Sequence, residues 1–294
     1  MPSHRSAVFI LSALTCVFSR AAPPATRPIE TGALTLIFDT KSPLGDPAKI
    51  TKRAGWSLDG IKKQIEIDYD PAKETFDAVV PASYDASEPY GLFVWIGAGD
   101  DAKPPAGWSE VLARHKLIWV GATKSGNKRA VLIRMGLVFD AVDGMKSRYR
   151  IDPQRVDISG VSGGGKVASV IGVEYPEVFT GGFYFIGADF YRAVPSTPGR
   201  EWGKAYNLPE PKLLMLERKR SRHVLLTGDK DLNRDPIRAF AAAFKADRFE
   251  HITLLDVPGL GHQLPDAAWF DKGLIALDEV PVAATKPAKK INPI

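Results

Sequence analysis

Apolar residues follow two different patterns along the chain. In the early part, three short runs rich in β-branched and aromatic residues, at 31–38, 64–69 and 75–81, are separated by Pro, Gly and Asp and predict strands. From Gly91 onward, continuous apolar runs alternate with segments of helical spacing. These runs predict six further strands, at residues 92–96, 117–120, 156–158, 183–186, 224–226 and 252–255. Such alternation is typical of βαβ units on a buried parallel sheet.

A long helix is predicted between the second and third of these later strands. Apolar side chains recur there at helical spacing, with charged residues among them, at Val131, Met135, Val138, Val142 and Met145. The segment is long enough for roughly five to six turns, so we expect one helix to cover a face of the sheet. The predicted fold class is α/β, a mostly parallel, doubly wound sheet of about eight strands with flanking helices.

The composition is that of a folded protein with a balanced charge. Of 294 residues, 45% are hydrophobic and 25% are charged, which is enough to bury a sizeable core and argues against disorder. The formal charge of +5 arises from five cations in residues 1–21 and 281–294, which contain no acids, so the middle of the chain is neutral. The basic run at 218–222 follows an apolar helical segment and is interpreted as a solvated helix end. Nucleic acid is therefore not expected as a partner.

The N-terminus has the three parts of a signal peptide. A short basic region with Arg5 precedes the apolar residues 7–18, and Ser19-Arg20-Ala21 has the small-x-small pattern of a cleavage site. The apolar stretch is too short to span a bilayer, so no stable membrane insertion is expected. We predict that residues 1–21 are removed and that the protein is exported, to the periplasm or the extracellular space.

Cleavage would also remove the only cysteine, Cys16. Lipid attachment at this cysteine is disfavoured, because Thr15 is bulkier than the residue that usually precedes a lipidated cysteine. Without Cys16, neither a disulfide nor a cysteine metal site can form. Residues 22–280 are predicted to form the folded domain, including its leading strands, and residues 281–294, rich in Pro, Ala and Lys, a flexible basic tail.

A glycine-rich turn joins the strand at 156–158 to an apolar helical segment. Its residues 160–164 match the pattern G-x-S-x-G, in which the outer glycines, Gly160 and Gly164, permit a turn too sharp for residues with a Cβ. The central Ser162 is then held in a strained conformation, with its hydroxyl projecting from the edge of the sheet. This arrangement predicts a nucleophilic serine, although the pattern alone is weak and depends on its partners.

A phosphate-binding loop is the alternative interpretation of the same residues. Gly160 to Lys166 also fits G-x-x-x-x-G-K, the loop of nucleotide hydrolases. The next residue should be Ser or Thr to ligate magnesium, but it is Val167, whose side chain cannot coordinate a hard cation. We therefore disfavour nucleotide hydrolysis.

A serine nucleophile needs a base to accept its proton, and histidine has the suitable pKa. His115, His223 and His251 each precede a predicted strand, at the edge opposite the strand ends where ligands bind, and are interpreted as surface residues. His262 lies in a glycine-containing loop after the last predicted strand, at the same edge as Ser162. His262 is therefore the predicted base.

The base in turn needs a carboxylate to orient it, and the turn after Leu226 offers Asp229 and Asp231. Asp229 directly follows Gly228, and we expect it to bind N–H groups of the turn. Asp231 lies two residues further on, with room to reach the imidazole. The resulting chain order of serine, aspartate and histidine is that of α/β-hydrolases rather than of the serine proteases.

The oxyanion of a tetrahedral intermediate needs two fixed N–H donors. One is expected from Gly163, which follows the nucleophile, and the other from the loop after the third strand, through Ala98 or Gly99. Small residues in this loop let the backbone approach a substrate closely.

At these motifs the chain resembles secreted esterases of the α/β-hydrolase superfamily, related to poly(3-hydroxybutyrate) depolymerases and feruloyl esterases. The resemblance covers roughly residues 64–279, and four further segments carry it: 80–84 (VPASY), 151–156 (IDPQRV), 175–179 (YPEVF) and 258–262 (PGLGH). It implies a triad of Ser162, Asp231 and His262 and hydrolysis of a small-molecule or polymeric ester through an acyl-enzyme. Neither cofactor nor metal is expected. The chain departs from the pattern at Ile96-Gly97, where these esterases commonly carry His-Gly.

Substrate-binding residues are expected in the segment at 189–212, which follows a strand at the active edge. Phe190, Tyr191 and Trp202 could line an acyl or aryl pocket, or only attach a long loop to the body of the protein. Two alternatives to an esterase stay open: a serine peptidase of the same fold, and a hydrolase-like protein without activity. The oligomeric state cannot be predicted.

Overall fold

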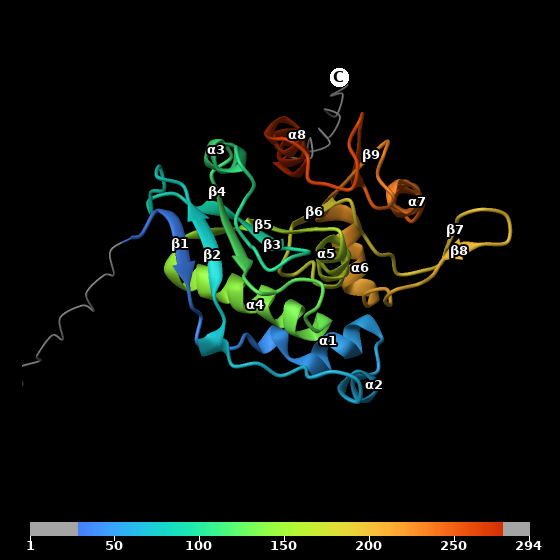
Figure 1. Cartoon of the computed structure of the whole chain (residues 1–294), viewed down its shortest axis with the longest axis horizontal. Coiled ribbons are helices and arrows are strands. Elements are labelled where there is room, and N and C mark those ends of the chain that lie inside the picture. The colour runs from blue at the N-terminus through green and yellow to red at the C-terminus, as the bar shows by residue number, and fades with distance from the viewer. Residues whose placement is uncertain (1–28, 279–294) are drawn as a thin grey trace, which may run out of the picture.

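Eight strands form one mixed sheet in the computed structural model, which describes residues 29–278 (Figure 1). The strands lie in the order β1-β2-β4-β3-β5-β6-β9-β10. β2 runs antiparallel to both of its neighbours, β1 and β4, and all other neighbouring strands pair in parallel, so the sheet is mostly parallel as predicted. The bounds are β1 Gly32–Leu36, β2 Phe76–Val80, β3 Tyr90–Ile96, β4 Leu117–Ala122, β5 Ile151–Val161, β6 Gly181–Phe185, β9 Arg222–Gly228 and β10 His251–Val257.

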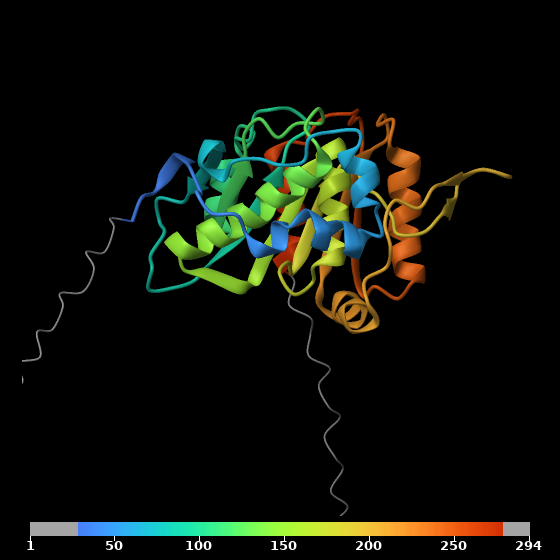
Figure 2. The same cartoon turned by 90° about the horizontal axis from the view of Figure 1, so that it is seen from below.

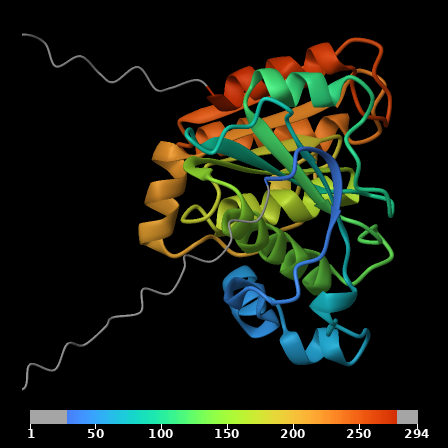
Figure 3. The ribbon, with the colours of Figure 1, turned by 90° about the vertical axis from the view of Figure 1, so that its left-hand side faces the viewer.

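Helices cover both faces of the sheet (Figure 3). On one side lie α3 and α8, and on the other lie α4 and α5, with α1 and α2 packed outside them. This doubly wound arrangement confirms the predicted fold class. The helices are α1 Pro47–Ala54, α2 Leu58–Lys62, α3 Trp108–Arg114, α4 Val131–Arg148, α5 Gly163–Glu174, α6 Pro211–Arg220, α7 Arg234–Ala246 and α8 Ala267–Asp278, with 3-10 turns η1 Pro43–Gly45 and η2 Pro71–Lys73.

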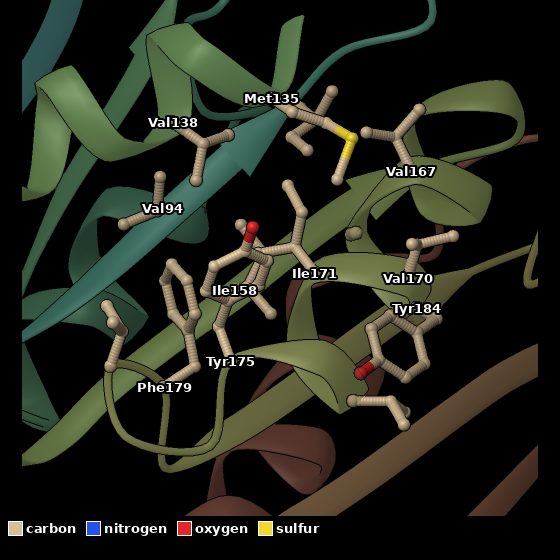
Figure 4. Close-up of a cluster of buried hydrophobic side chains, with 14 of the residues drawn as sticks. Val94, Met135, Val138, Ile158, Val167, Val170, Ile171, Tyr175, Phe179 and Tyr184 are labelled. Atoms are coloured by element: carbon tan, nitrogen blue, oxygen red, sulfur yellow. The ribbon is translucent and has the colours of Figure 1, made fainter. Parts of the chain in front are cut away.

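The central strands supply one core to each face. Along β3, Phe93 faces the layer of α3 and α8, whereas Val94 faces α4 and α5, because successive side chains of a strand point to opposite faces. Figure 4 shows Val94 and Ile158 of the sheet against side chains of α4 and α5. On the other face, Trp108 of α3 stacks on Phe270 of α8 with ring centroids 3.9 Å apart. The buried sheet therefore forms a rigid platform whose strand ends carry the loops described below.

The predicted long helix is confirmed as α4, which spans 18 residues, whereas the strand predicted at 64–69 is wrong. That segment contains no strand because the Glu66 carboxylate accepts hydrogen bonds from the N–H groups of Ile67 and Asp68, groups that a strand would pair with a neighbour. The short helix α1 was not predicted, although Asp46 caps it by accepting from the Ala48 and Lys49 N–H groups.

One of the three histidines interpreted as surface residues is buried. His223, at the start of β9, is 1% exposed and lies between Glu217 of α6 and the Tyr184 hydroxyl. The prediction failed because α6 packs over the start of this strand. His115 is half-buried and contacts Asp271 and Asp278 of α8.

The segment between β6 and α6 carries a small hairpin of β7 (Val194–Pro195) and β8 (Glu201–Trp202). The hairpin projects away from the rest of the domain, next to α7, in both Figure 1 and Figure 2. None of the helices in residues 29–278 is long and apolar enough to cross a membrane. The predicted signal peptide (1–21) and basic tail (281–294) lie outside the described residues.

Candidate active site

Ser162 occupies a sharp turn between β5, which ends at Val161, and α5, which begins at Gly163. Its backbone has φ +52° and ψ −118°, a conformation that residues with a Cβ rarely adopt. Neighbouring backbone leaves no space for side chains: a methyl group on Gly164 would lie 2.0 Å from the Ile96 carbonyl oxygen. The predicted strained turn is thus confirmed, and its glycines are required by close backbone packing.

The structure brings Ser162, His262 and Asp231 together in one hydrogen-bonded chain. His262 Nδ1 lies 2.7 Å from Asp231 Oδ1, and His262 Nε2 lies 3.0 Å from Ser162 Oγ. Since an ionised carboxylate only accepts, Nδ1–H donates to Asp231, and Nε2 is left to accept from the serine hydroxyl. The arrangement can take a proton from Ser162 as its oxygen attacks an electrophile.

Other polar groups hold the Asp231 carboxylate, whose side chain is fully buried. Oδ2 accepts from the Thr227 hydroxyl at 2.7 Å, and Oδ1 also accepts from the Asn233 N–H at 3.1 Å. These bonds satisfy a buried charge and fix its direction toward His262. Asp229 points elsewhere, because its Oδ1 accepts from the Gly259 N–H at 2.7 Å. The two aspartates therefore have the separate contacts that turn chemistry predicted.

His262 follows a turn that is bound to the loop of the aspartates. The Leu260 carbonyl accepts from the Lys230 N–H, and Leu260 is buried beneath the turn. Gly259 has φ +76°, which favours glycine at this position. The His262 side chain is 31% exposed, so it contacts solvent on one side and Asp231 on the other.

Two loops lie against the start of α5, where the predicted oxyanion donors are found. Gly163 is the first residue of α5, and its N–H is one of the unpaired donors of a helix N-terminus, which favours negative charge. Ala98 lies in the loop after β3, and its carbonyl accepts from the Asn127 N–H at 2.9 Å. Gly163 thus directly follows Ser162, whereas the loop of Ala98 approaches the elbow through the Ile96 and Gly97 carbonyls, which lie against Gly164.

Two residues near the elbow, Asn127 and Arg134, were not singled out in the sequence. A methyl group on Gly163 would lie 2.3 Å from Asn127 Oδ1, so the carboxamide lies directly against the elbow. Arg134 of α4 is buried and donates to the Gly97 and Ser125 carbonyls, both at 2.9 Å. The position of Asn127, in the loop that follows the predicted strand at 117–120, was the available signal.

The predicted substrate-binding rings are placed differently. Phe190 and Tyr191 are 0% and 2% exposed and stack on each other with ring centroids 4.2 Å apart. This burial supports the alternative interpretation, in which the rings attach the segment to the body of the protein, here to Phe244 of α7. Trp202 is partly exposed in β8 and packs on Phe240.

A cavity of about 210 Å³ lies instead along the first turns of α5. Mostly apolar side chains line it, from the N-terminal helices, α4, α5 and the segment before α6: Trp56, Ile61, Val131, Val167, Val170 and Ala205. Lys166 and Asp189 add an ion pair at 4.0 Å. Burial raises the pKa of the Asp189 carboxyl, and Lys166 partly opposes this. Lys166 is one helical turn from Ser162, so the cavity lies close to the elbow.

The residues of the alternative phosphate loop do not form an open loop. Helix α5 begins at Gly163, within the pattern, and the Lys166 side chain pairs with Asp189. This geometry gives no support to nucleotide binding. Among residues 29–278, no group of three or more His, Cys, Asp or Glu side chains is arranged to hold a metal ion.

Comparison with solved structures identifies the fold of the chain. The feruloyl esterase module of Clostridium thermocellum, complexed with sinapinate, matches with a TM-score of 0.51 and 15% identity, over 69% of this chain and 81% of that one. Esterase 2 of Thermogutta terrifontis, phosphorylated by paraoxon, matches with a TM-score of 0.50 and 17% identity, over 70% and 87%. The chain has the α/β-hydrolase fold.

Comparison of sequences adds one more specific relationship. Poly(3-hydroxyalkanoate) depolymerase C of Paucimonas lemoignei is 33% identical over 91 residues, which cover 24% of this chain and 22% of that protein. The chain is a distant homologue of this depolymerase, and the match spans about a fifth of that relative's length. No protein-family model matches the chain.

Proposed function

We propose that the protein is a serine hydrolase that cleaves carboxylic esters through an acyl-enzyme. The observation that carries this proposal is the chain of hydrogen bonds from Asp231 through His262 to Ser162 at a strained turn. The depolymerase homologue and the esterases of the same fold support an ester as the substrate. Export of the protein remains part of the proposal.

The geometry supports a two-stage reaction. Ser162 Oγ attacks the ester carbonyl while His262 Nε2 takes its proton, and Asp231 stabilises the imidazolium that results. The Gly163 N–H, at the N-terminus of α5, donates to the developing oxyanion. His262 then protonates the leaving alcohol, and water releases the acyl group by the same steps in reverse.

The cavity beside α5 is the proposed place for the acyl group. Its apolar lining favours a hydrocarbon chain or ring, and its volume of about 210 Å³ favours short and medium acyl groups over long ones. Assay of a series of p-nitrophenyl esters from acetyl to palmitoyl should therefore show kcat/KM falling toward the long chains.

Active-site labelling tests the proposal. We expect a fluorophosphonate probe to form a covalent adduct on Ser162 and ester hydrolysis to stop with it, because the probe reacts with an activated serine. Mass spectrometry of the digested protein locates the adduct. Ser162→Ala should lose labelling and at least about 10³-fold in kcat while remaining folded.

Buried Ser159 provides a matched control at the same strand. Its hydroxyl donates to the Phe183 carbonyl, so Ser159→Ala should keep the labelling of Ser162. Labelling of another serine, or full activity in folded Ser162→Ala, would reject the nucleophile. A folded wild-type protein that is neither labelled nor active on any ester would favour the non-catalytic alternative. Efficient cleavage of peptide amides, with kcat/KM comparable to that for matched esters, would favour a peptidase.

A further inference from the structure

The side chain of Asn127 lies against Gly163, the residue that follows the reacting serine, and has no role in the triad. It comes from the loop between β4 and α4, and its carboxamide lies against the Cα of Gly163. The side chain is exposed, and within the described part of the chain neither Oδ1 nor Nδ2 has a hydrogen-bond partner. A free carboxamide at this position can bind a ligand at the elbow.

Two backbone hydrogen bonds join this loop to the loop after β3. The Asn127 N–H donates to the Ala98 carbonyl at 2.9 Å, and the Lys124 N–H donates to the Asp100 carbonyl at 2.8 Å. The loops after β3 and β4 therefore form one unit beside the elbow. Such a unit can present donors without rearranging during a reaction, which is what electrostatic stabilisation of a transition state requires.

Arg134 lies beneath both loops as a buried cation. Its guanidinium donates to the Gly97 and Ser125 carbonyls, and no carboxylate in residues 29–278 pairs with it. Burial lowers the pKa of Arg134 to about 10, so it is still charged at neutral pH. It positions the two loops and adds positive potential on the side where negative charge would develop.

We propose that Asn127 Nδ2–H is a further hydrogen-bond donor to the oxyanion, an inference that rests on the proposed esterase function. When Ser162 Oγ bonds to the carbonyl carbon, its proton passes to His262 Nε2 and the C=O π electrons move to the oxygen. The resulting alkoxide accepts from the Gly163 N–H and from Asn127 Nδ2–H. When the C–O bond to the alcohol breaks, the C=O bond re-forms and His262 returns its proton to the alcohol.

Two substitutions at Asn127 test this role. Asn127→Ala removes the carboxamide, and Asn127→Asp keeps its shape but removes the donor. We expect kcat on a p-nitrophenyl ester to fall about 10²-fold in Asn127→Ala, as for the loss of one oxyanion donor, with KM nearly unchanged. The loss in Asn127→Asp should be at least as large, because its carboxylate also repels the oxyanion. Lys128→Ala, at the exposed neighbouring position, is the control and should have wild-type kcat.

An inhibitor that forms an alkoxide gives an independent measurement. An alkyl trifluoromethyl ketone adds reversibly to the serine hydroxyl, and its oxygen then occupies the place of the oxyanion. Its inhibition constant should rise in both Asn127 variants by the same factor by which kcat/KM falls. Thermal unfolding shows whether the variants are folded. If Asn127→Ala is unstable, Asn127→Asp, which has nearly the shape of the native side chain, provides the test.

Several outcomes separate this inference from the proposed function. Wild-type kcat and ketone affinity in both folded Asn127 variants would overturn the role of Asn127 and leave the esterase standing. A rise in KM with unchanged kcat would also overturn it, because it would assign Asn127 to ground-state substrate binding. A folded wild-type protein that neither hydrolyses esters nor binds the ketone would overturn the proposed function, and the inference with it.

Discussion

At the scale of single residues, two aspartates that are two positions apart have different contacts. Asp231 is buried and bonded to His262, Thr227 and the Asn233 N–H, whereas Asp229 accepts from the Gly259 N–H near the surface. Asp231 can therefore orient the imidazole. Asp229 can only stabilise the turn that leads to His262.

Amide substitution at each aspartate tests this division. Asp231→Asn keeps the shape but favours the wrong histidine tautomer, so we expect turnover to fall by up to about 10⁴-fold. Asp229→Asn should keep most of the turnover and lose about 1 kcal/mol of stability, because its hydrogen bond to the turn weakens. Steady-state kinetics and urea unfolding of both variants provide the comparison. A larger loss of turnover in Asp229→Asn would assign the orienting acid to that residue.

At the scale of elements, the turn from β5 to α5 depends on glycines of its neighbours as well as on its own. A methyl group on Gly187, in the loop after β6, would lie 2.1 Å from the Ser162 carbonyl oxygen. The Ser162 atoms in this contact belong to the backbone, so they cannot move aside without shifting the end of β5 or the start of α5. The conformation of Ser162 is therefore set in part by contact between its turn and the loop after β6.

Alanine substitution of two glycines measures this constraint. Gly187→Ala should destabilise the fold by about 1–3 kcal/mol, the usual cost of overpacking, and should lower kcat by displacing Ser162. Gly203→Ala is the control, because no atom lies within 4 Å of its added methyl group, and its stability should change by less than about 0.5 kcal/mol. Chemical unfolding measures both. Equal stability of the two variants would show that the loop contact is easily relaxed.

At the scale of the whole molecule, a charged cluster joins the end of α8 to α3 and β5. His115 Nδ1 lies 3.0 Å from Asp278 and its Nε2 lies 2.8 Å from Asp271, while Arg155 also binds Asp278. The hydrogen bond to Asp278 raises the pKa of His115, and the Asp271 bond adds to it. Bonds from His115 likewise lower the pKa of Asp271 and, with burial opposing, of Asp278. The cluster connects segments that are far apart in the chain.

The pKa shifts predict how the stability of this connection depends on pH. Because the folded pKa of His115 is raised, its contribution is complete below the unfolded value of about 6.5 and is lost as pH rises through the folded value. Because the aspartate pKa values are lowered, their contribution is lost as pH falls below about 4. His115→Gln should therefore cost about 1 kcal/mol at pH 5 and less at pH 9, as measured by urea unfolding. An equal cost at both pH values would contradict an ionic role.

The sequence by itself determined the architecture and the sharp turn at Ser162. Continuous apolar runs predicted β3, β4, β5, β6, β9 and β10, and helical spacing predicted α4, because periodicity depends on which side of an element is buried. The G-x-S-x-G pattern around Ser162 and the glycine-containing loop of His262 are also local signals, because each depends on a few consecutive residues. The run at 64–69 failed because Glu66 binds the local backbone, a competition that apolar spacing does not report.

Only the tertiary structure decided which groups from distant segments meet. Nothing in the spacing of residues shows that Asn127 contacts Gly163, that Arg134 binds two loops, or that α6 buries His223. The aromatic rings at 190 and 191 were compatible with a pocket or with the core until α7 was placed against them. Local patterns specify elements and turns, whereas contacts across loops depend on the packing of the whole sheet, which the order and twist of its strands determine.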